Sequence, residues 1–154
     1  MFHARSESLQ GTGTLILRLA VGIVLIAHGL QKALGFDAWA GTVEQLGVPV
    51  PELMAALAMA TELGGGALIL LGFFTPLAAV AVFVTMMVAI VAVHLPNGLM
   101  AADNGFEYPL VLAASALFLL LHGPGPYSVD AWIASRARGP EVRRGRYPGH
   151  VVPT

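Results

Sequence analysis

A long apolar segment that carries two cations constrains this chain more than any other feature. Residues 15–36 are apolar enough and long enough to cross a bilayer, yet they contain Arg18, His28 and Lys32. A spanning helix needs about 20 mostly apolar residues, and a charge in hydrocarbon must face a protein interior or a wet cavity. The segment is therefore predicted to be the helix of a small membrane bundle that carries its polar residues, and these residues are expected to face the interior of the bundle.

The composition agrees with a membrane protein. Of the 154 residues, 56% are hydrophobic and 11% are charged, and the mean hydropathy is +0.76. These values lie outside the range of soluble globular proteins. No basic patch is interleaved with aromatic residues, so nucleic acid is not an expected partner. The sequence has no cysteine, which excludes thiolate catalysis and iron–sulfur ligation by this chain.

The apolar windows predict an all-α fold, a four-transmembrane-helix bundle in the lipid bilayer. The second span is expected to open at Pro51, after a loop over residues 37–50. Thr75 is expected to cap the third span, which ends near Leu95, and the fourth runs from about Tyr108 to His122. The segments are a loosely ordered cytoplasmic N-terminus (1–13), the transmembrane domain (14–122), a short interfacial amphipathic helix (123–135) and a basic flexible tail (136–154).

The charges predict the orientation. Cytoplasmic segments of membrane proteins are rich in Lys and Arg. The tail carries five arginines between residues 136 and 146, whereas the two long loops carry only acids. Four spans place both termini on one side of the membrane. The N and C termini are therefore predicted to be cytoplasmic.

Small and polar residues in the first two spans predict where helices meet. Gly22, Gly29, Gly65 and Gly66 are candidates for close helix packing, because small residues let helix backbones approach. Arg18, near the inner end of its span, is a candidate for structural ion pairing.

A second group is predicted to gather in the outer half of the bundle. Glu62 lies near the middle of its span, at a costly depth for a carboxylate. Side chains lean toward the N-terminus of their own helix, so His28 is expected to be the direct partner of Glu62, and Lys32 to pair with the outer acids. The candidates for binding a ligand or relaying protons are His28, Lys32, Glu62, His94 and Glu107. No metal site is assigned.

These motifs resemble the DoxX/DoxD-like family of small four-span bacterial membrane proteins. The resemblance covers roughly residues 10 to 135. It rests on Arg18, Gly22, His28-Gly29 and Lys32, on Glu62 with Gly65-Gly66, and on Gly123-Pro124-Gly125 followed by Ser128-Val129-Asp130.

The resemblance also suggests which membrane, which kind of partner and which kind of ligand to expect. Family members are usually associated with redox complexes, including the membrane subunits of thiosulfate:quinone oxidoreductase. Related mycobacterial proteins are linked with a thiosulfate sulfurtransferase and a superoxide dismutase. The resemblance implies the bacterial inner membrane, a redox partner and a quinone ligand, without establishing an enzymatic activity.

Two function classes compete. The first is an integral membrane subunit of a quinone-linked or sulfur- and oxidative-stress-linked oxidoreductase complex, with a polar pocket in the outer half of the bundle. Such a subunit would need other protein subunits, because no covalent cofactor is expected on this chain. The alternative is a non-catalytic scaffold or assembly subunit whose buried polar residues lock helix packing. Besides lipid, the expected partners are other protein subunits of a redox complex or further copies of this chain in a homo-oligomer. A haem or metal held by His28 and His94 is a third reading, and a transporter is disfavoured because no inverted repeat is seen.

Overall fold

The first helix begins well before the apolar segment. The computed structural model describes residues 2–137, with side chains from residue 8 onward, and within this range the chain is helical with no strand. Helix α1 runs over Phe2–Leu34, so the expectation of a loosely ordered segment is wrong for residues 2–13. Gly11 packs against Pro126, where a Cβ would lie 2.6 Å from the proline Cγ. This contact stabilises the helix at a position where Gly11 by itself would favour a break in the helix.

The second apolar window forms one continuous helical run with a π-helical turn in its middle. It consists of α3 (Pro51–Ala60), the π-helical turn η1 (Thr61–Gly65) and α4 (Gly66–Leu71). The segment before it was expected to be a loop but contains helix α2 (Phe36–Gln45). The indole N–H of Trp39 donates a hydrogen bond to the carbonyl of Ala55, at 3.1 Å, and fastens α2 to α3.

The remaining elements form an antiparallel pair and a short terminal helix. They are α5 (Thr75–Ala89), the π-helical turn η2 (Ile90–His94), the 3₁₀ turns η3 (Leu95–Asn97) and η4 (Ala101–Asp103), α6 (Glu107–His122) and α7 (Val129–Ala137).

Three helical runs of the described chain are long and apolar enough to cross a membrane. They cover Ser8–Leu34, Pro51–Leu71 and Thr75–Asn97. Helix α6 is apolar but has 16 residues, which gives a length of about 24 Å at 1.5 Å per residue. The predicted count of four spans therefore depends on α6.

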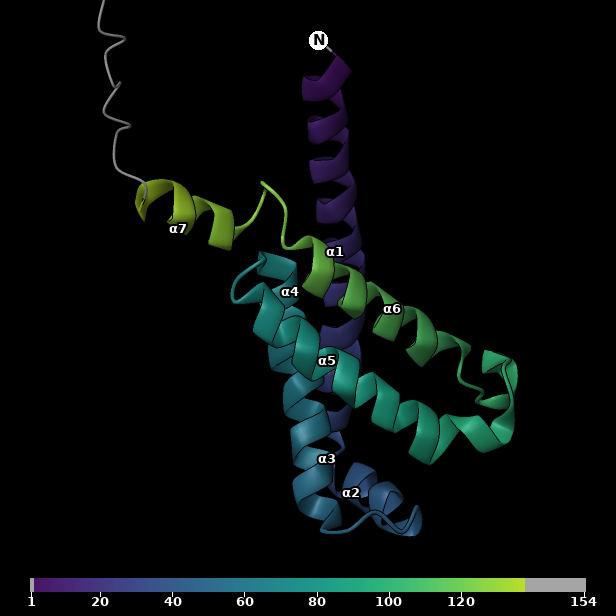
Figure 1. Ribbon diagram of the computed structural model, residues 1–154. Helices are drawn as coiled ribbons and strands as arrows, with labels where there is room; N and C mark the ends of the chain where they lie inside the picture. The colour runs from purple at the N-terminus through teal and green to yellow at the C-terminus, as the bar shows by residue number, and fades with distance from the viewer. Residues whose placement is uncertain (1, 138–154) are drawn as a thin grey trace, which may run out of the picture.

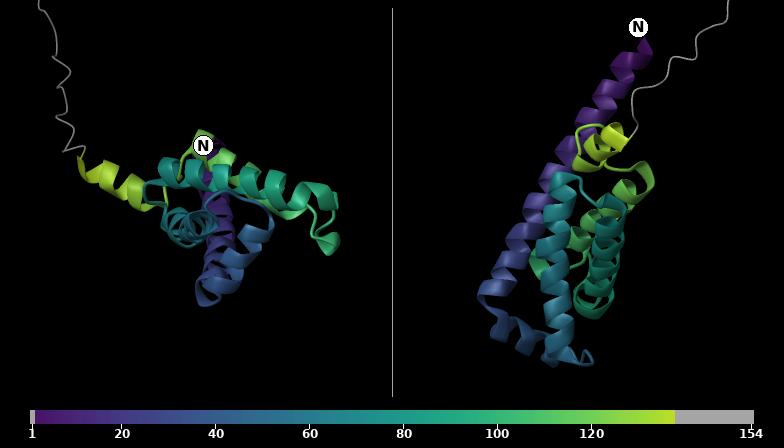
Figure 2. Two further views of the ribbon diagram at one scale, coloured as in Figure 1. Left: turned by 90° about the horizontal axis from the view of Figure 1, so that it is seen from below. Right: turned by 90° about the vertical axis from the view of Figure 1, so that its left-hand side faces the viewer.

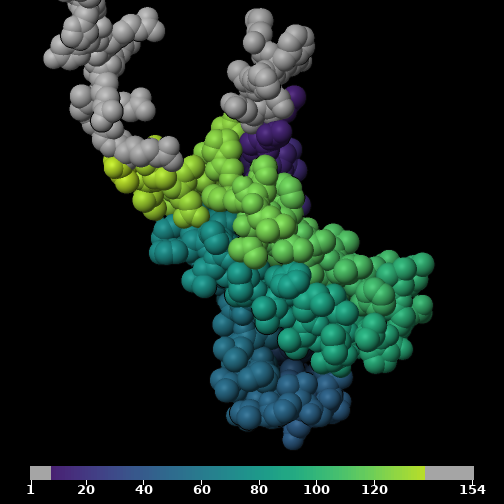
Figure 3. Space-filling view, in the orientation of Figure 1, coloured from purple at the N-terminus to yellow at the C-terminus, as the bar shows by residue number. Residues whose placement is uncertain are grey.

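The helices form two crossed layers (Figure 1). Helix α1 packs along α4 and η1, while α5 and α6 lie side by side and run obliquely across them. The right-hand view of Figure 2 shows α1 as the longest element, with α7 toward its N-terminal end and α2 at the opposite end. In the space-filling view the α2–α3 end projects beyond the α5–α6 pair (Figure 3). The core at the crossing includes Leu25, Ile69, Val82, Ala116 and Leu119.

The turn between α4 and α5 is held by a residue far along the chain. The Asp130 carboxylate accepts hydrogen bonds from the backbone N–H groups of Phe74 (2.9 Å) and Thr75 (3.0 Å). The N-terminus of α5 is thus capped by Asp130, and the expectation that the Thr75 side chain would cap it is wrong. Residues 138–154, which include most of the predicted basic tail, lie outside the described residues.

Candidate functional site

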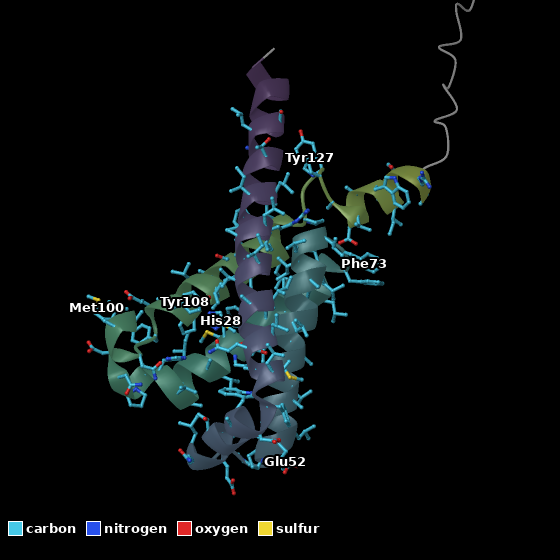
Figure 4. All side chains as sticks on the ribbon, turned by 180° about the vertical axis from the view of Figure 1, so that it is seen from behind. His28, Glu52, Phe73, Met100, Tyr108 and Tyr127 are labelled. Carbon is cyan, nitrogen blue, oxygen red and sulfur yellow. The ribbon has the colours of Figure 1, made fainter. Side chains whose placement is uncertain are left out.

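Two side chains of the candidate group come from one face of α1. His28 and Lys32 lie four residues apart, and residues at this spacing are neighbours on a helix surface. Lys32 occupies the last turn of α1, where a cation interacts favourably with the helix dipole. Figure 4 shows His28 beside Tyr108 of α6, while Glu52 lies at the far α2–α3 end.

The third side chain comes from η1. Glu62 is 6% exposed and lies in this π-helical turn. π-helical turns inside α-helices are rare and occur frequently at functional sites. Gly29 of α1 lies so close to η1 that a Cβ would be 2.6 Å from the backbone nitrogen of Leu63. This close approach brings Glu62 within reach of the end of α1.

Lys32 and Glu62 form a largely buried ion pair. The Lys32 ammonium donates hydrogen bonds to both carboxylate oxygens of Glu62, and the two side chains are 19% and 7% exposed. The ring centroid of Trp39 lies 4.8 Å from the same ammonium, within cation–π distance. The charge of Glu62 is therefore neutralised by Lys32, and the Lys32 charge is shielded by an aromatic face.

This pairing corrects the expected partners. His28 was expected to contact Glu62 directly, and Lys32 to pair with the outer acids. The contact between Gly29 and Leu63 sets a helix register in which Lys32 and Glu62, each leaning toward the N-terminus of its own helix, converge. His28 lies one turn further from the end of α1 and faces α6, with its ring centroid 5.4 Å from that of Tyr108.

The ion pair borders a cavity of about 540 Å³, here called the polar cavity. Helices α1, α2 and α6 and the turns η1 and η2 all contribute to it, and Leu25, Met86 and Leu112 supply apolar wall. Its polar lining residues are His28, Lys32, Trp39, Thr42, Glu62, His94, Asn104 and Tyr108.

His94 reaches the polar cavity from the second π-helical turn. Its Nδ1 lies 2.8 Å from the carbonyl oxygen of Asn104. A carbonyl only accepts hydrogen bonds, so Nδ1 is the donor in this contact. The bond fixes the His94 ring to the loop after η4.

Glu107 does not join this group. Its Oε1 accepts a hydrogen bond of 2.6 Å from the backbone N–H of Ala101, and the residue is absent from the lining of the polar cavity. Its carboxylate fastens the loop between η4 and α6. Glu107, which the sequence grouped with the ligand candidates, therefore lies outside the polar cavity.

Arg18 lies away from the cavity and binds backbone oxygens. It is 2% exposed, and its guanidinium donates to the carbonyls of Pro124 (2.7 Å), Tyr127 (2.9 Å) and Leu70 (3.2 Å). Arg18 was predicted to form an ion pair, but it forms none with the described side chains. Among these side chains, the salt bridge joins Lys32 and Glu62. Arg18 instead ties α1 to α4 and to the segment between α6 and α7.

Two aromatic residues of the site were missed by sequence reasoning. Trp39 fell within the expected loop over residues 37–50, and Tyr108 was treated only as the start of the fourth span. Both lie near span ends at the level of Lys32 and His28, and this shared depth is the signal that could have identified them. The packing glycines lie where the pattern placed them: a Cβ at Gly22 would be 2.6 Å from Leu70 Cβ, and one at Gly66 would be 2.8 Å from Leu25 Cβ.

The crossed apolar helices and the buried ion pair define an integral membrane protein of the helical class. The profile of the DoxX family matches residues 13–95, and the chain belongs to the DoxX family. It is 36% identical to Inner membrane protein YphA of Escherichia coli, over 75% of this chain and 86% of that protein. It is 34% identical to the protein named Putative oxidoreductase CatD of Bacillus subtilis, over 79% and 87%, and 32% identical to Inner membrane protein YqjF of Escherichia coli, over 80% and 94%. No solved structure matches the chain.

Proposed function

We propose that this chain is a membrane subunit of an oxidoreductase complex and that it binds a quinone-type ligand in the polar cavity. The observation that carries the proposal is the Lys32–Glu62 pair at the wall of a cavity that also holds His28, His94 and Tyr108. Titratable residues inside a membrane protein are costly and usually mark a functional path. The name of the relative CatD, which refers to an oxidoreductase, agrees with this class.

The side chains of the cavity suit a quinone. The carbonyl oxygens of a quinone accept hydrogen bonds, and the cavity offers the Lys32 ammonium, the Tyr108 hydroxyl and the His28 ring as donors. Leu25, Met86 and Leu112 provide an apolar wall for a flat ring. When bound, a quinone supplies two-electron, two-proton redox chemistry. In this proposal, the electrons come from a partner subunit, while His28, His94 and Glu62 hold or move protons.

The proposal includes a membrane arrangement. Helix α6 completes four spans in the bacterial inner membrane, both termini are cytoplasmic, and the polar cavity lies in the outer half of the bilayer. The arginine-rich tail and the acid-only loops support this orientation. The described ends of the chain lie toward the same end of the molecule, as four spans require (Figure 1).

The test uses the two tryptophans of the sequence as reporters. Trp39 lines the polar cavity, whereas Trp132 lies on α7 at the other end of the fold. In nanodiscs, a soluble benzoquinone should quench the fluorescence of the Trp132→Phe variant saturably, and Lys32→Met should weaken this quenching. The matched Trp39→Phe variant, which keeps Trp132, should show only unsaturated quenching by partitioned quinone. Identical, unsaturated curves for both variants would reject a quinone site.

A second candidate is a scaffold or assembly subunit, favoured by the fact that the Lys32–Glu62 pair joins α1 to η1. In this case the pair would only lock helix packing. Glu62→Gln would then lower the amount of folded protein but leave the activity of the native complex unchanged per folded molecule. A redox subunit should instead lose activity per folded molecule in this variant.

A further inference from the structure

A second cavity adjoins the ion pair from the side of α3 and α5. Its volume is about 180 Å³, and it is here called the apolar groove. Val43 of α2, Leu57 and Ala58 of α3, and Val84 and Val88 of α5 form its walls. Lys32 and Glu62 are the ionisable residues among its lining in the described part of the chain.

The apolar groove and the polar cavity share a boundary. Lys32, Glu62 and Trp39 line both of them. The ion pair and the indole ring therefore stand at the junction between a space lined by aliphatic side chains and a space lined by titratable ones.

The apolar groove opens toward the outer surface of two apolar helices. Leu57, Val84 and Val88 are 52%, 53% and 57% exposed. They belong to the runs Pro51–Leu71 and Thr75–Asn97, both apolar enough to cross a membrane. In a bilayer, exposed aliphatic residues of such helices face hydrocarbon. The groove therefore opens sideways into lipid.

The chemistry at the inner end of the groove, where it meets the polar cavity, selects the occupant. A molecule that extends from the lipid to the end of the groove meets aliphatic side chains first and then the charges of Lys32 and Glu62. The methyl end of a bulk lipid chain would meet charges there without offering a hydrogen bond, which is unfavourable. A molecule whose apolar tail changes to a polar head at this point satisfies both surfaces.

We infer that the ligand of this protein has a long apolar tail, which lies in the groove between α3 and α5 while its polar head occupies the polar cavity. This inference rests on the proposed function and specifies its ligand as a tailed, isoprenoid-type quinone that reaches the site sideways from the bilayer. Trp39 and the ion pair mark the point where the tail joins the head.

The experiment compares two benzoquinones with the same head, one without a tail and one with an isoprenoid tail. Saturable quenching of Trp39 is measured in the Trp132→Phe background in nanodiscs, and quenching of the Trp39→Phe variant corrects for partition into the bilayer. Ala58→Phe fills the apolar groove. Ala60→Phe is the matched control, because Ala60 lies on the same helix, is exposed and does not line the groove.

The tailed quinone should bind about tenfold more tightly than the tailless one after correction for partition. Ala58→Phe should remove this advantage and leave the tailless quinone within about twofold of its original affinity. Ala60→Phe should change neither affinity.

Three results would overturn the inference. If the tailless quinone binds, the tail adds nothing and Ala58→Phe has no effect, the tail site is wrong and the proposed function stands. If Ala58→Phe weakens both ligands equally, the tail makes no contribution of its own in the groove, and the inference fails. If neither quinone binds saturably, the proposed function fails and this inference fails with it.

Discussion

Gly29 and Leu63 touch through their backbones, and this contact sets the position of the ion pair. A Cβ on Gly29 would lie 2.6 Å from the nitrogen and 2.9 Å from the Cα of Leu63. The neighbour of Leu63 is Glu62, and Lys32 lies three residues beyond Gly29 on α1. The absence of a side chain at Gly29 therefore lets the carboxylate and the ammonium meet.

Gly29→Ala should destabilise the fold by about 1–3 kcal/mol, because the new methyl group meets backbone atoms that cannot move aside. Gly64→Ala is the matched control, since a Cβ there has nothing within 4 Å. It should cost nothing and can gain up to about 1 kcal/mol from helix propensity. Thermal unfolding of both variants in detergent measures the difference, and equal stability of the two would contradict the packing described for Gly29.

Removal of one partner of the ion pair should cost more than removal of both. Lys32→Met or Glu62→Gln alone leaves a largely buried charge without its partner, at a cost of about 3–5 kcal/mol. The double variant should be less destabilised than either single variant, because it leaves no unpaired charge. Glu44→Gln, which changes an exposed acid on α2, is the control and should be neutral. A double-mutant cycle with additive effects would show that the two side chains do not interact.

Most of the architecture could be predicted from the sequence, because long apolar windows in a chain of this composition permit little except spanning helices. The second span was expected to open at Pro51 and the third to end near Leu95, and the helical runs Pro51–Leu71 and Thr75–Asn97 begin and end close to these residues. Residues 2–13 and α2 were missed because their helices depend on tertiary contacts. Those contacts are Gly11 against Pro126 and the Trp39 hydrogen bond to Ala55, and local sequence does not encode them.

Four of the five candidates grouped from the sequence line one cavity in the structure, whereas the pairing of Lys32 with Glu62 was not predicted. His28, Lys32, Glu62 and His94 all line the polar cavity. The lean of side chains toward the N-terminus of their own helix favoured His28 rather than Lys32 as the partner of Glu62. The actual register depends on the contact between Gly29 and η1, and a one-turn difference in register exchanges one partner for the other.

Arg18→Lys should destabilise the protein although the charge is kept. The guanidinium donates to three carbonyls, one in α4 and two in the segment between α6 and α7. The ammonium of a lysine is a single point charge and cannot reproduce this forked set of hydrogen bonds. Each lost hydrogen bond to a charged group is worth about 1.5–3 kcal/mol. Arg136→Lys is the control, because Arg136 is exposed on α7. A melting temperature of Arg18→Lys equal to that of the control would contradict a structural role for these bonds.

The orientation can be tested by cysteine labelling, because the sequence contains no cysteine of its own. Ala38→Cys, at an exposed position of α2, should react with a membrane-impermeant maleimide in spheroplasts. Gly145→Cys, in the tail, should react only after the membrane is permeabilised. The charge distribution is the reason for this expectation. Labelling of the tail alone in intact spheroplasts would reverse the topology.

Helix α7 should lie along the membrane surface rather than leave it. It has nine residues, far fewer than a span requires, and carries Trp132 and Ile133 at 54% and 44% exposure. Arg136 lies 3.9 Å from the Trp132 ring, so an aromatic and a cation meet on one short helix, as is typical of interfacial segments. In the Trp39→Phe background, lipids brominated near the headgroup should quench Trp132 more strongly than lipids brominated near the chain ends. Aqueous iodide should quench it only weakly. Strong quenching by iodide together with no quenching by either lipid would place α7 in water and contradict an interfacial role.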